Sequence, residues 1–547
     1  MKLSSLRKAV ALAAFAALAA CGGGGAGSAS AVLPGREAAS RQEAVLTQIV
    51  AVGDSLTAGY QADGFLGATS VKNPLYPGKH VHPAQENGWW ALLDEQASSK
   101  PLETAIAQIY DPSISPLPLI QGPGLDNQIV PAGPSPFFPF GQLKTGDACT
   151  DNHGFNQAGY LFRGSTRVRM NPASTTIRNV GVPGITLHEA NVIHQPQTTT
   201  CSPLPGIPGL LSDVVAEESG TFWPVLRNFT HLGPHLTEVN AAASRHPTLA
   251  TIWLGANDVL KYMGSGGRFV GGDRNAGQAE SDLRAAIGTL QHAGARVVVA
   301  NLPNILETGF FQRVTIPKRL ADCKIATYAY CLLAQQGFSS NVVSQLAKRY
   351  HLATPQGCEP TSLSKPCGYL TLPGVVEVIS YHSTTGKIPD LDCAKPSPHC
   401  KSVPGSGLGM NYITPEFAGK VQALNSAVNT GIDNAARSSR VPLVDITAIF
   451  DGLASGDPSN PYFAEAASIN PGKCCTLGFL YGILSFDGLH PSNTGYALIA
   501  YDFIKTINKA YGTQIPEVDV QAVYGGTRCS NKQYCFPDPY APPNDIP

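Results

Sequence analysis

The chain has few charged residues and almost no net charge. Of its 547 residues, 14% are Asp, Glu, Lys or Arg, and the formal net charge at pH 7 is −1. Nucleic-acid-binding surfaces are strongly basic, so the composition gives no support for a nucleic-acid partner. The hydrophobic fraction of 43% argues against disorder of the whole chain. We expect a globular protein, and its 56 glycines and 44 prolines indicate long loops.

Long apolar runs are absent after the N-terminus, and the run near the N-terminus is short. Residues 1–8 are basic and residues 9–20 are apolar, which is typical of a signal peptide. The run ends in Leu18-Ala19-Ala20-Cys21, which resembles the lipobox of bacterial lipoproteins. This resemblance implies cleavage after residue 20, a lipid on Cys21 and a flexible tether over 21–43. We expect an exported, membrane-anchored protein at the outer membrane or cell surface; a plain secretory signal is the alternative.

No Cys-x-x-Cys pair of the kind found in zinc sites occurs among the 13 cysteines. Without Cys21 they leave an even number, which favours disulfides in an oxidising compartment. We expect local disulfides within the close pairs Cys323/Cys331, Cys358/Cys367, Cys393/Cys400 and Cys529/Cys535, with Cys149/Cys201 a looser pair and Cys474-Cys475 adjacent. His399 beside Cys400 leaves a zinc site as the alternative. We predict no metal and no cofactor.

Short apolar strands alternate with amphipathic helices along the chain. Strands are predicted over 47–53, 176–181, 249–254, 296–302 and 441–446, and helices over 88–97, 280–292, 417–436 and 493–511. Short buried strands between helices favour a parallel sheet covered on both faces. Two Pro-, Gly- and Cys-rich stretches, about 99–175 and 305–414, are predicted to be insertions in one domain over 44–515. A disulfide-stapled tail over 516–547 follows.

The sequence Gly53-Asp54-Ser55-Leu56 follows the first predicted strand. A serine at such a strand-to-helix turn can expose its hydroxyl beside free backbone N–H groups, although Gly-Asp-Ser is also an ordinary turn sequence. A nucleophilic serine needs a base, and the base needs an orienting acid. The turn Asp487-Gly-Leu-His490-Pro before the last predicted helix offers both. We therefore expect Ser55 as nucleophile, His490 as base and Asp487 as orienting acid.

Two further polar turns follow predicted strands. Asn179-Val-Gly-Val-Pro-Gly184 is glycine-rich, so a backbone N–H there can approach a ligand closely. Gly255-Ala-Asn257-Asp258 ends the next strand, and the side-chain amide of Asn257 could reach the same crevice. Each turn alone has an ordinary structural interpretation. Together they supply candidate donors for the oxyanion of a tetrahedral intermediate.

The four motifs together resemble the GDSL-type, or SGNH, hydrolase superfamily. The resemblance implies a three-layer α/β/α sandwich with a flavodoxin-like central parallel sheet, enlarged here by the two insertions. It also implies Ser55, His490 and Asp487 as the catalytic triad, and Ser55, Gly184 and Asn257 as the oxyanion hole, without metal or cofactor. The two insertions have no counterpart in the compact family core. The identity of the ester therefore stays open.

The sequence predicts an exported serine esterase or lipase that works through an acyl-enzyme intermediate. Its substrate would be an ester of a lipid or of an acylated carbohydrate. A carbohydrate or cell-wall O-acetylesterase is the first alternative, and a non-catalytic surface binding lipoprotein is the second. Because the base must be neutral, we expect the rate to fall as the pH drops through the histidine range of about 6 to 7.

Overall fold

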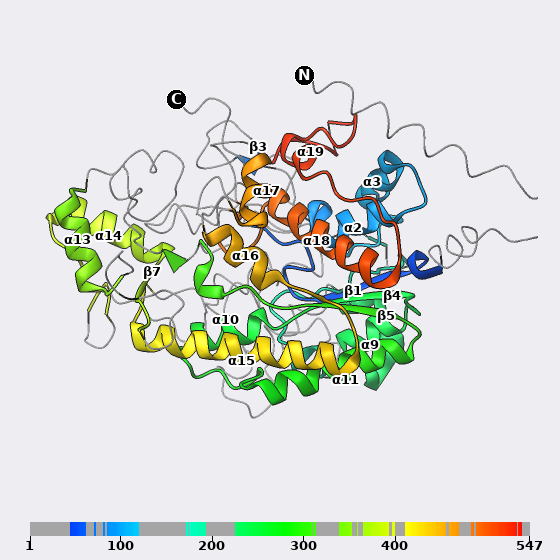
Figure 1. The fold of residues 1–547 in the computed structure, drawn as a ribbon, viewed down its shortest axis with the longest axis horizontal. Helices are drawn as coiled ribbons and strands as arrows, with labels where there is room; N and C mark the ends of the chain where they lie inside the picture. The colour runs from blue at the N-terminus through cyan, green and yellow to red at the C-terminus, as the bar shows by residue number, and fades with distance from the viewer. Residues whose placement is uncertain are drawn as a thin grey trace, which may run out of the picture. The chain divides into compact units, whose positions relative to one another are not determined.

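Figure 1 shows the fold in a computed structural model of the chain. It describes residues 44–61, 71–72, 80–81, 85–119, 171–172, 174–192, 225–309, 311–312, 338–352, 358, 365–392, 397–399, 411–455, 459–469, 483–485, 488–532 and 534–538. All of these belong to one compact unit, Ala44–Pro547. The predicted signal peptide, Cys21 and the predicted tether lie outside the described residues.

A parallel sheet of four strands forms the centre of this unit. Its order is β1 (Ile49–Gly53), β4 (Leu249–Trp253), β5 (Arg296–Ala300) and β9 (Leu443–Val444). On the other side of β1, Asn179 forms a parallel bridge to Ala51. Nearly every residue of the three long strands is buried, which explains their mostly apolar sequences. The segment around Asn179, which follows β1 in the chain, therefore lies at the edge of the sheet next to β1, and β4, β5 and β9 follow on the other side. This is the flavodoxin-like strand order 2-1-3-4-5.

Helices cover both faces of the sheet (Figure 1). One layer contains α9 (Glu238–Ala243), α10 (Ala256–Gly264), α11 (Ala276–His292) and α15 (Pro415–Ser439). The other contains α2 (Trp89–Ala97), α3 (Leu102–Tyr110), α18 (Asn493–Tyr511) and α19 (Val520–Gly525). In the second layer Trp89 stacks on Phe503, with ring centroids 4.0 Å apart. The predicted three-layer α/β/α architecture is confirmed.

The predicted elements of this core agree closely with the observed ones. Helix α18 has the predicted bounds, begun by the Ser492 side chain that accepts from Gly495 N and ended by Gly512 in a left-handed conformation. Helices α11 and α15 extend beyond the predicted 280–292 and 417–436. The strand predicted over 176–181 is reduced to the single bridge at Asn179.

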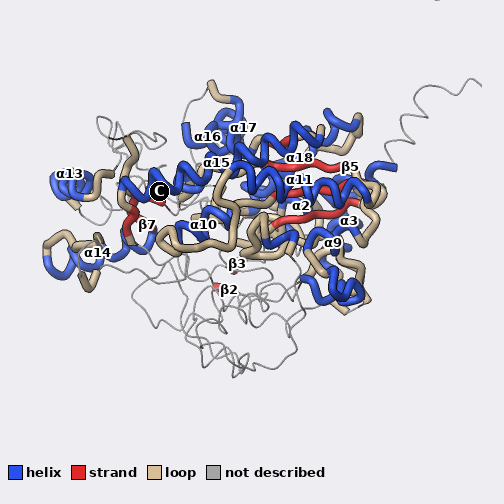
Figure 2. The backbone as a smooth tube through the Cα atoms, turned by 90° about the horizontal axis from the view of Figure 1, so that it is seen from below, coloured by secondary structure: helices blue, strands red, loops and turns tan. Residues whose placement is uncertain are grey.

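Part of the second predicted insertion has its own small core. Strands β6 (Phe311–Gln312), β7 (Tyr369–Thr371) and β8 (Tyr412–Ile413) pair antiparallel, and α13 (Ser340–Arg349) and α14 (Leu372–Thr385) accompany them. Buried residues such as Leu346, Tyr350 and Val378 form an apolar cluster separate from the main one. Figure 2 shows α13, α14 and β7 together beyond the end of the central sheet. This stretch is therefore a folded subdomain rather than only a loop.

Four further short elements form two pairs. Helices α16 (Ile446–Ser455) and α17 (Pro461–Ile469) pack on each other, and β2 (Val71–Lys72) pairs with β3 (His80–Val81). Within the described part of the chain, no helix is both long and apolar enough to span a membrane.

The C-terminal tail is anchored to the core. Val520 and Val523 of α19 join the main apolar cluster, and the Arg528 guanidinium donates to the buried Glu95 carboxylate of α2. The disulfides Cys529–Cys535 and Cys358–Cys367 are present as predicted. The predicted pairs Cys323/Cys331, Cys393/Cys400 and Cys149/Cys201, and Cys474-Cys475, lie outside the described residues.

Candidate active site

The turn after β1 holds Ser55 at the carboxyl end of the sheet. Gly53 closes the strand, and a Cβ there would lie 2.0 Å from Thr57 Oγ1 and 2.8 Å from the Trp253 carbonyl oxygen. Only glycine fits such a close approach. The turn is then closed by Ala58 N donating to the Asp54 carbonyl and Tyr60 N donating to the Ser55 carbonyl, each at 2.9 Å. The Ser55 side chain lines a cavity at this edge.

His490 reaches Ser55 from the opposite end of the sequence. Its Nε2 lies 2.9 Å from Ser55 Oγ, a hydrogen-bond distance across 435 positions of the chain. The turn that carries it is closed by Ser485 N donating to the His490 carbonyl at 2.7 Å. The ring edge of Tyr60 packs against the imidazole, with centroids 4.6 Å apart. The structure thus brings together the predicted nucleophile and base, and Tyr60 helps to orient the ring.

The predicted orienting acid, Asp487, lies outside the described residues. Gly488, which follows it, has φ of +71° and closes a turn with its N–H to the Ser485 carbonyl at 2.9 Å. A left-handed residue between Asp487 and His490 reverses the chain there. The assignment of Asp487 therefore stays a prediction.

Asn257 lies beside the nucleophile, and its amide already has acceptors. It is the second residue of α10 and lines the same cavity as Ser55. Its Nδ2 donates to Asp54 Oδ2 at 3.1 Å and to the Ile185 carbonyl at 3.0 Å. Two N–H groups therefore meet two acceptors. To bind an oxyanion, this amide must exchange one of these partners for the substrate oxygen.

Gly184 lies in a turn that packs against the nucleophile turn. Val182 N donates to the Gly53 carbonyl at 2.7 Å, and Gly184 itself has φ of +80°. Among the described residues, the N–H groups of Ser55 and Gly184 donate to no acceptor. Gly184 is absent from the residues that line the cavity at Ser55. Both backbone donors are open, and the Ser55 N–H is the closer to the reacting hydroxyl.

Two buried acids next to the nucleophile were not predicted from the sequence. Burial raises the pKa of Asp54 to about 7, although its carboxylate accepts from Leu56 N. Burial also raises the pKa of Glu238 well above its usual value, and Glu238 Oε1 accepts from Gly53 N at 2.7 Å. Asp54 orients Asn257, while Glu238 fixes the end of β1. Glu238 has no local sequence signal, because it opens a short helix 185 positions away.

The cavity at Ser55 is small and mostly apolar. Its volume is about 30 Å³, far below the roughly 300–1,000 Å³ of ordinary ligand pockets. The polar atoms of Ser55, Asn257 and His490 meet there. The remaining wall is largely hydrophobic and includes Leu56, Trp253, Ala256, Leu260, Pro303, Ile305, Phe450 and Leu489. The site therefore suits a polar reacting group with an apolar substituent.

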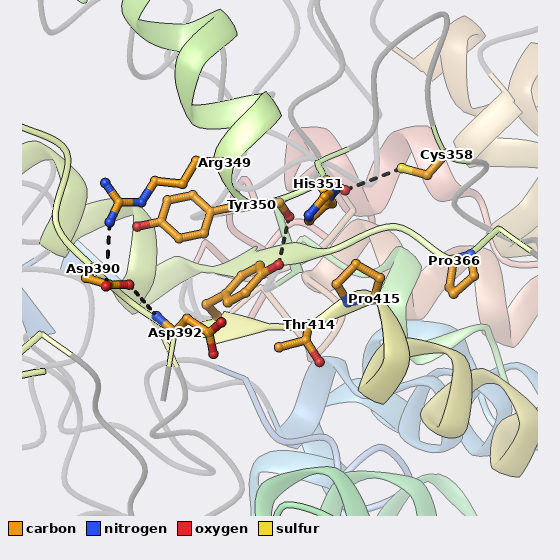
Figure 3. Close-up of a pocket in the computed structure, with 10 residues that line it drawn as sticks. Arg349, Tyr350, His351, Cys358, Pro366, Asp390, Asp392, Thr414 and Pro415 are labelled. Atoms are coloured by element: carbon orange, nitrogen blue, oxygen red, sulfur yellow. Dashed lines mark hydrogen bonds and ion pairs between the residues drawn. The ribbon is translucent and has the colours of Figure 1, made fainter. Parts of the chain in front are cut away.

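A larger cavity of about 660 Å³ lies in the subdomain of the second insertion (Figure 3). Tyr412 OH donates to the Tyr350 carbonyl at 2.9 Å across it, and Arg349 lies 3.6 Å from Asp390. It shares no lining residue with the cavity at Ser55. The size of a cavity does not by itself identify an active site. The smaller cavity is the candidate active site because Ser55 and His490, which are within hydrogen-bond distance of each other, line it.

The comparisons with known proteins agree with this geometry. The family model described as GDSL-like lipase/acylhydrolase matches residues 49–353, more than half of the chain. No curated protein and no solved structure matches it. The matched span begins at β1 and contains Ser55, Gly184 and Asn257, whereas His490 lies beyond it. On the motif, the sheet and the family match, this chain belongs to the GDSL-like lipase/acylhydrolase family and is an acyl hydrolase of the esterase/lipase type.

Proposed function

We propose that the chain hydrolyses carboxylic esters, with Ser55 as nucleophile and His490 as its base. The observation that carries this proposal is the 2.9 Å separation of Ser55 Oγ and His490 Nε2 at the carboxyl end of the sheet. Ser55 attacks the ester carbonyl, and its proton passes to His490 Nε2. The alcohol leaves with that proton, and an acyl-enzyme remains on Ser55. Water then attacks the acyl group and gives a proton to His490, and the imidazolium returns that proton to Ser55 Oγ as the carboxylic acid leaves.

Charge on the carbonyl oxygen must be stabilised in both steps. In the proposal, the N–H groups of Ser55 and Gly184 and the amide of Asn257 donate to it. The N–H groups of Ser55 and Gly184 have no acceptor among the described residues, which supports this role. Asp487 would hold the imidazole so that Nε2 faces Ser55. Asp487→Asn should then lower kcat strongly with little change in KM, whereas unchanged kcat would remove it from the triad.

The apolar wall of the cavity favours an ester whose acyl part is hydrophobic. Trp253, Leu260 and Phe450 surround the space beside Ser55. The test is a series of p-nitrophenyl esters from acetyl to palmitoyl, each measured with wild type and with Ser55→Ala. Activity that peaks above acetyl, and disappears in the variant, supports a lipolytic or general esterase.

The small volume of the cavity favours a second candidate, an O-acetylesterase that acts on carbohydrate. A space of about 30 Å³ is much smaller than ordinary ligand pockets, so it favours a short acyl group over a long chain. Activity confined to the acetyl ester, together with acetate release from an acetylated polysaccharide, would support this candidate. Turnover of long-chain esters at higher kcat/KM would exclude it.

We also propose that the protein is exported and anchored by a lipid on Cys21. The basic segment 1–8, the apolar segment 9–20 and the residues before Cys21 support this. Radiolabelled fatty acid should enter the wild-type protein and not Cys21→Ser. Equal labelling of both proteins would contradict lipidation at this residue.

A further inference from the structure

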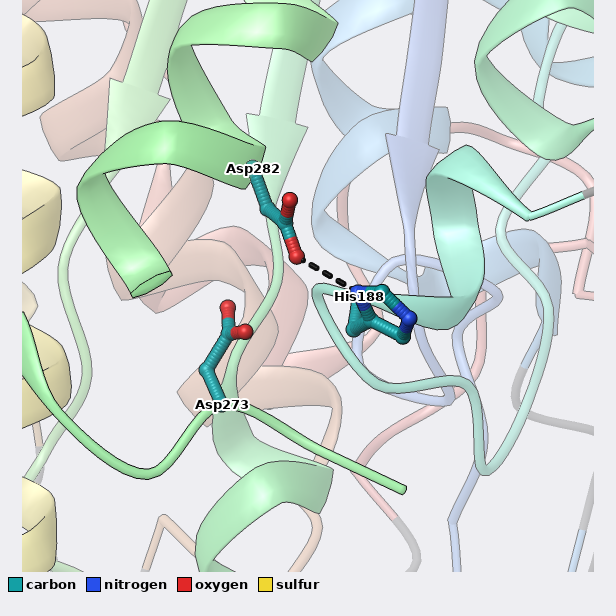
Figure 4. Close-up of side chains that lie close together, drawn as sticks. All are labelled: His188, Asp273 and Asp282. Carbon is teal, nitrogen blue, oxygen red and sulfur yellow. Dashed lines mark hydrogen bonds and ion pairs between the residues drawn. The ribbon is translucent and has the colours of Figure 1, made fainter. Parts of the chain in front are cut away.

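A second cluster of polar side chains lies behind the segment that carries Gly184. It consists of His188, Asp273 and Asp282, and each offers one ligand atom within 4.8 Å of the others (Figure 4). His188 directly precedes the short 3₁₀ helix η2 (Glu189–Asn191), Asp273 lies in the loop before α11, and Asp282 lies within α11. Three separate segments thus converge on one point.

The cluster contains two carboxyl groups, those of Asp273 and Asp282, but one basic side chain, that of His188. His188 Nδ1 lies 2.8 Å from Asp282 Oδ2, and it is the one basic group in the cluster. Arg274, the next residue after Asp273, has its guanidinium 5.3 Å from the centre of the Tyr262 ring. Lys261 is already paired with both oxygens of Glu189, at 3.0 and 2.9 Å. Among the described residues, neither Arg274 nor Lys261 forms an ion pair with Asp273 or Asp282.

Asp273 is the most informative member. Its side chain is 3% exposed, and Oδ2 has no hydrogen-bond partner among the described residues. Figure 4 shows its carboxyl group turned toward Asp282. A buried carboxyl oxygen without a partner, aimed at a second carboxylate, is explained if a cation lies between them.

We propose that His188, Asp273 and Asp282 bind one divalent cation of the Zn²⁺ class. One imidazole nitrogen and two carboxylate oxygens are ligand types that Zn²⁺ accepts, and water can complete a four-coordinate site. Ligand atoms around Zn²⁺ lie roughly 3 to 3.5 Å apart, so the observed separations need only small movements. The imidazole favours Zn²⁺ over Ca²⁺ and Mg²⁺, which prefer oxygen ligands throughout.

The surroundings are organised as a metal site requires. Asp258 Oδ1 accepts from Asp273 N at 2.6 Å, and its Oδ2 accepts from Leu187 N at 2.9 Å. One buried carboxylate thus fixes the backbone of two ligand-bearing segments. Asn191 Nδ2 donates to the Asp282 carbonyl at 3.2 Å and ties η2 to α11. A cation here would clamp the Gly184 segment against α11 without contacting the substrate.

The test is Zn²⁺ binding to the chelator-treated full chain, measured by calorimetry and by metal content after dialysis. Wild type should bind one more Zn²⁺ than Asp273→Asn, and that ion should raise the Tm of wild type by a few degrees. His188→Gln should weaken binding at this site by about tenfold or more, because it removes the single nitrogen ligand. His188 has a half-exposed side chain, so this variant should fold normally.

Two matched controls come from the same helix. Glu280→Gln changes a partly exposed group of α11 and His292→Gln an exposed one, both outside the cluster, and both variants should bind Zn²⁺ as wild type does. Equal stoichiometry and equal Tm response in wild type and Asp273→Asn would overturn the proposal. In that case the cluster is an ion pair of His188 and Asp282 beside a neutral Asp273, and Asp273→Asn should leave the Tm of the metal-free protein unchanged or higher.

Discussion

Two neighbouring residues of α10 serve two different polar groups. Asn257 faces Ser55 and His490, whereas Asp258 holds the backbones of Leu187 and Asp273 behind them. The first group is a hydroxyl and an imidazole in a mostly apolar cavity. The second is a set of carboxylates with one histidine. This difference indicates two separate roles. In our proposal, the Ser55 side of the Gly184 segment carries out the hydrolysis, and the Asp273 side holds the segment in place.

The largest expected effect is on the Ser55 side. Ser55→Ala should lower kcat for a p-nitrophenyl ester by about 10⁴-fold or more, because the acyl-enzyme cannot form. Its Tm should stay within a few degrees of wild type. Asp282→Asn, on the other side, should retain kcat within about tenfold, since it touches no reacting atom. An equal loss of kcat in Ser55→Ala and Asp282→Asn would contradict the separate roles of the Ser55 site and the His188 cluster.

Asn257→Ala should have the next largest effect. Loss of one oxyanion donor typically lowers kcat by about 10²–10³-fold. KM should change less, because the interaction strengthens in the transition state. Single-turnover kinetics on wild type and variant will check this. A near-wild-type rate would mean that the amide serves only Asp54 and Ile185, as in the resting structure.

Asp54→Asn should lower kcat by a smaller factor, about tenfold. The new amide can still accept from Leu56 N, but it cannot serve both Leu56 and the amide of Asn257 as the carboxylate does. Asn257 would then lose its orientation while Ser55 and His490 stay in contact. Steady-state kinetics will measure the loss. An effect as large as that of Ser55→Ala would assign Asp54 a direct role in the reaction.

The smallest expected effect is on the pH dependence of stability. Asp54 has a pKa of about 7 in the folded protein, raised by burial, against about 3.9 when unfolded. Folding therefore takes up a proton between these values, and the free energy of unfolding falls as the pH rises from about 4 to 7. Asp54→Asn should reduce this slope by up to about 1.4 kcal/mol per pH unit. Urea unfolding at several pH values will show it, and identical slopes would contradict the burial argument.

The approach of Ser55 to Asn257 and His490 could be predicted from the sequence because the signals of this candidate site are local. Ser55 and Asn257 each directly follow a buried strand, and parallel strands bring their carboxyl ends to one edge. The start of α18 could also be predicted, because Ser492 is a typical N-cap residue and its side chain accepts from Gly495 N. The engagement of the Asn257 amide by Asp54 was not predicted, since it depends on side-chain positions.

The other side left no comparable signal. His188 and Asp282 are 94 positions apart and belong to segments without a recognisable motif. Helices α3 and α14 were also missed, because they lie in stretches whose Pro and Gly content indicated loops. Strands of two or three residues, such as β6 and β8, are too short for an alternation pattern. Tertiary packing, rather than local sequence, determines these elements.

The most direct test of the catalytic assignment is labelling by a fluorophosphonate probe, followed by peptide mass spectrometry. The account predicts a single adduct, on the peptide that contains Ser55. Labelling should be lost in Ser55→Ala and strongly slowed in His490→Ala, while Asp282→Asn should be labelled at nearly the wild-type rate. An adduct on another residue, or ester hydrolysis that persists in Ser55→Ala, would contradict the account.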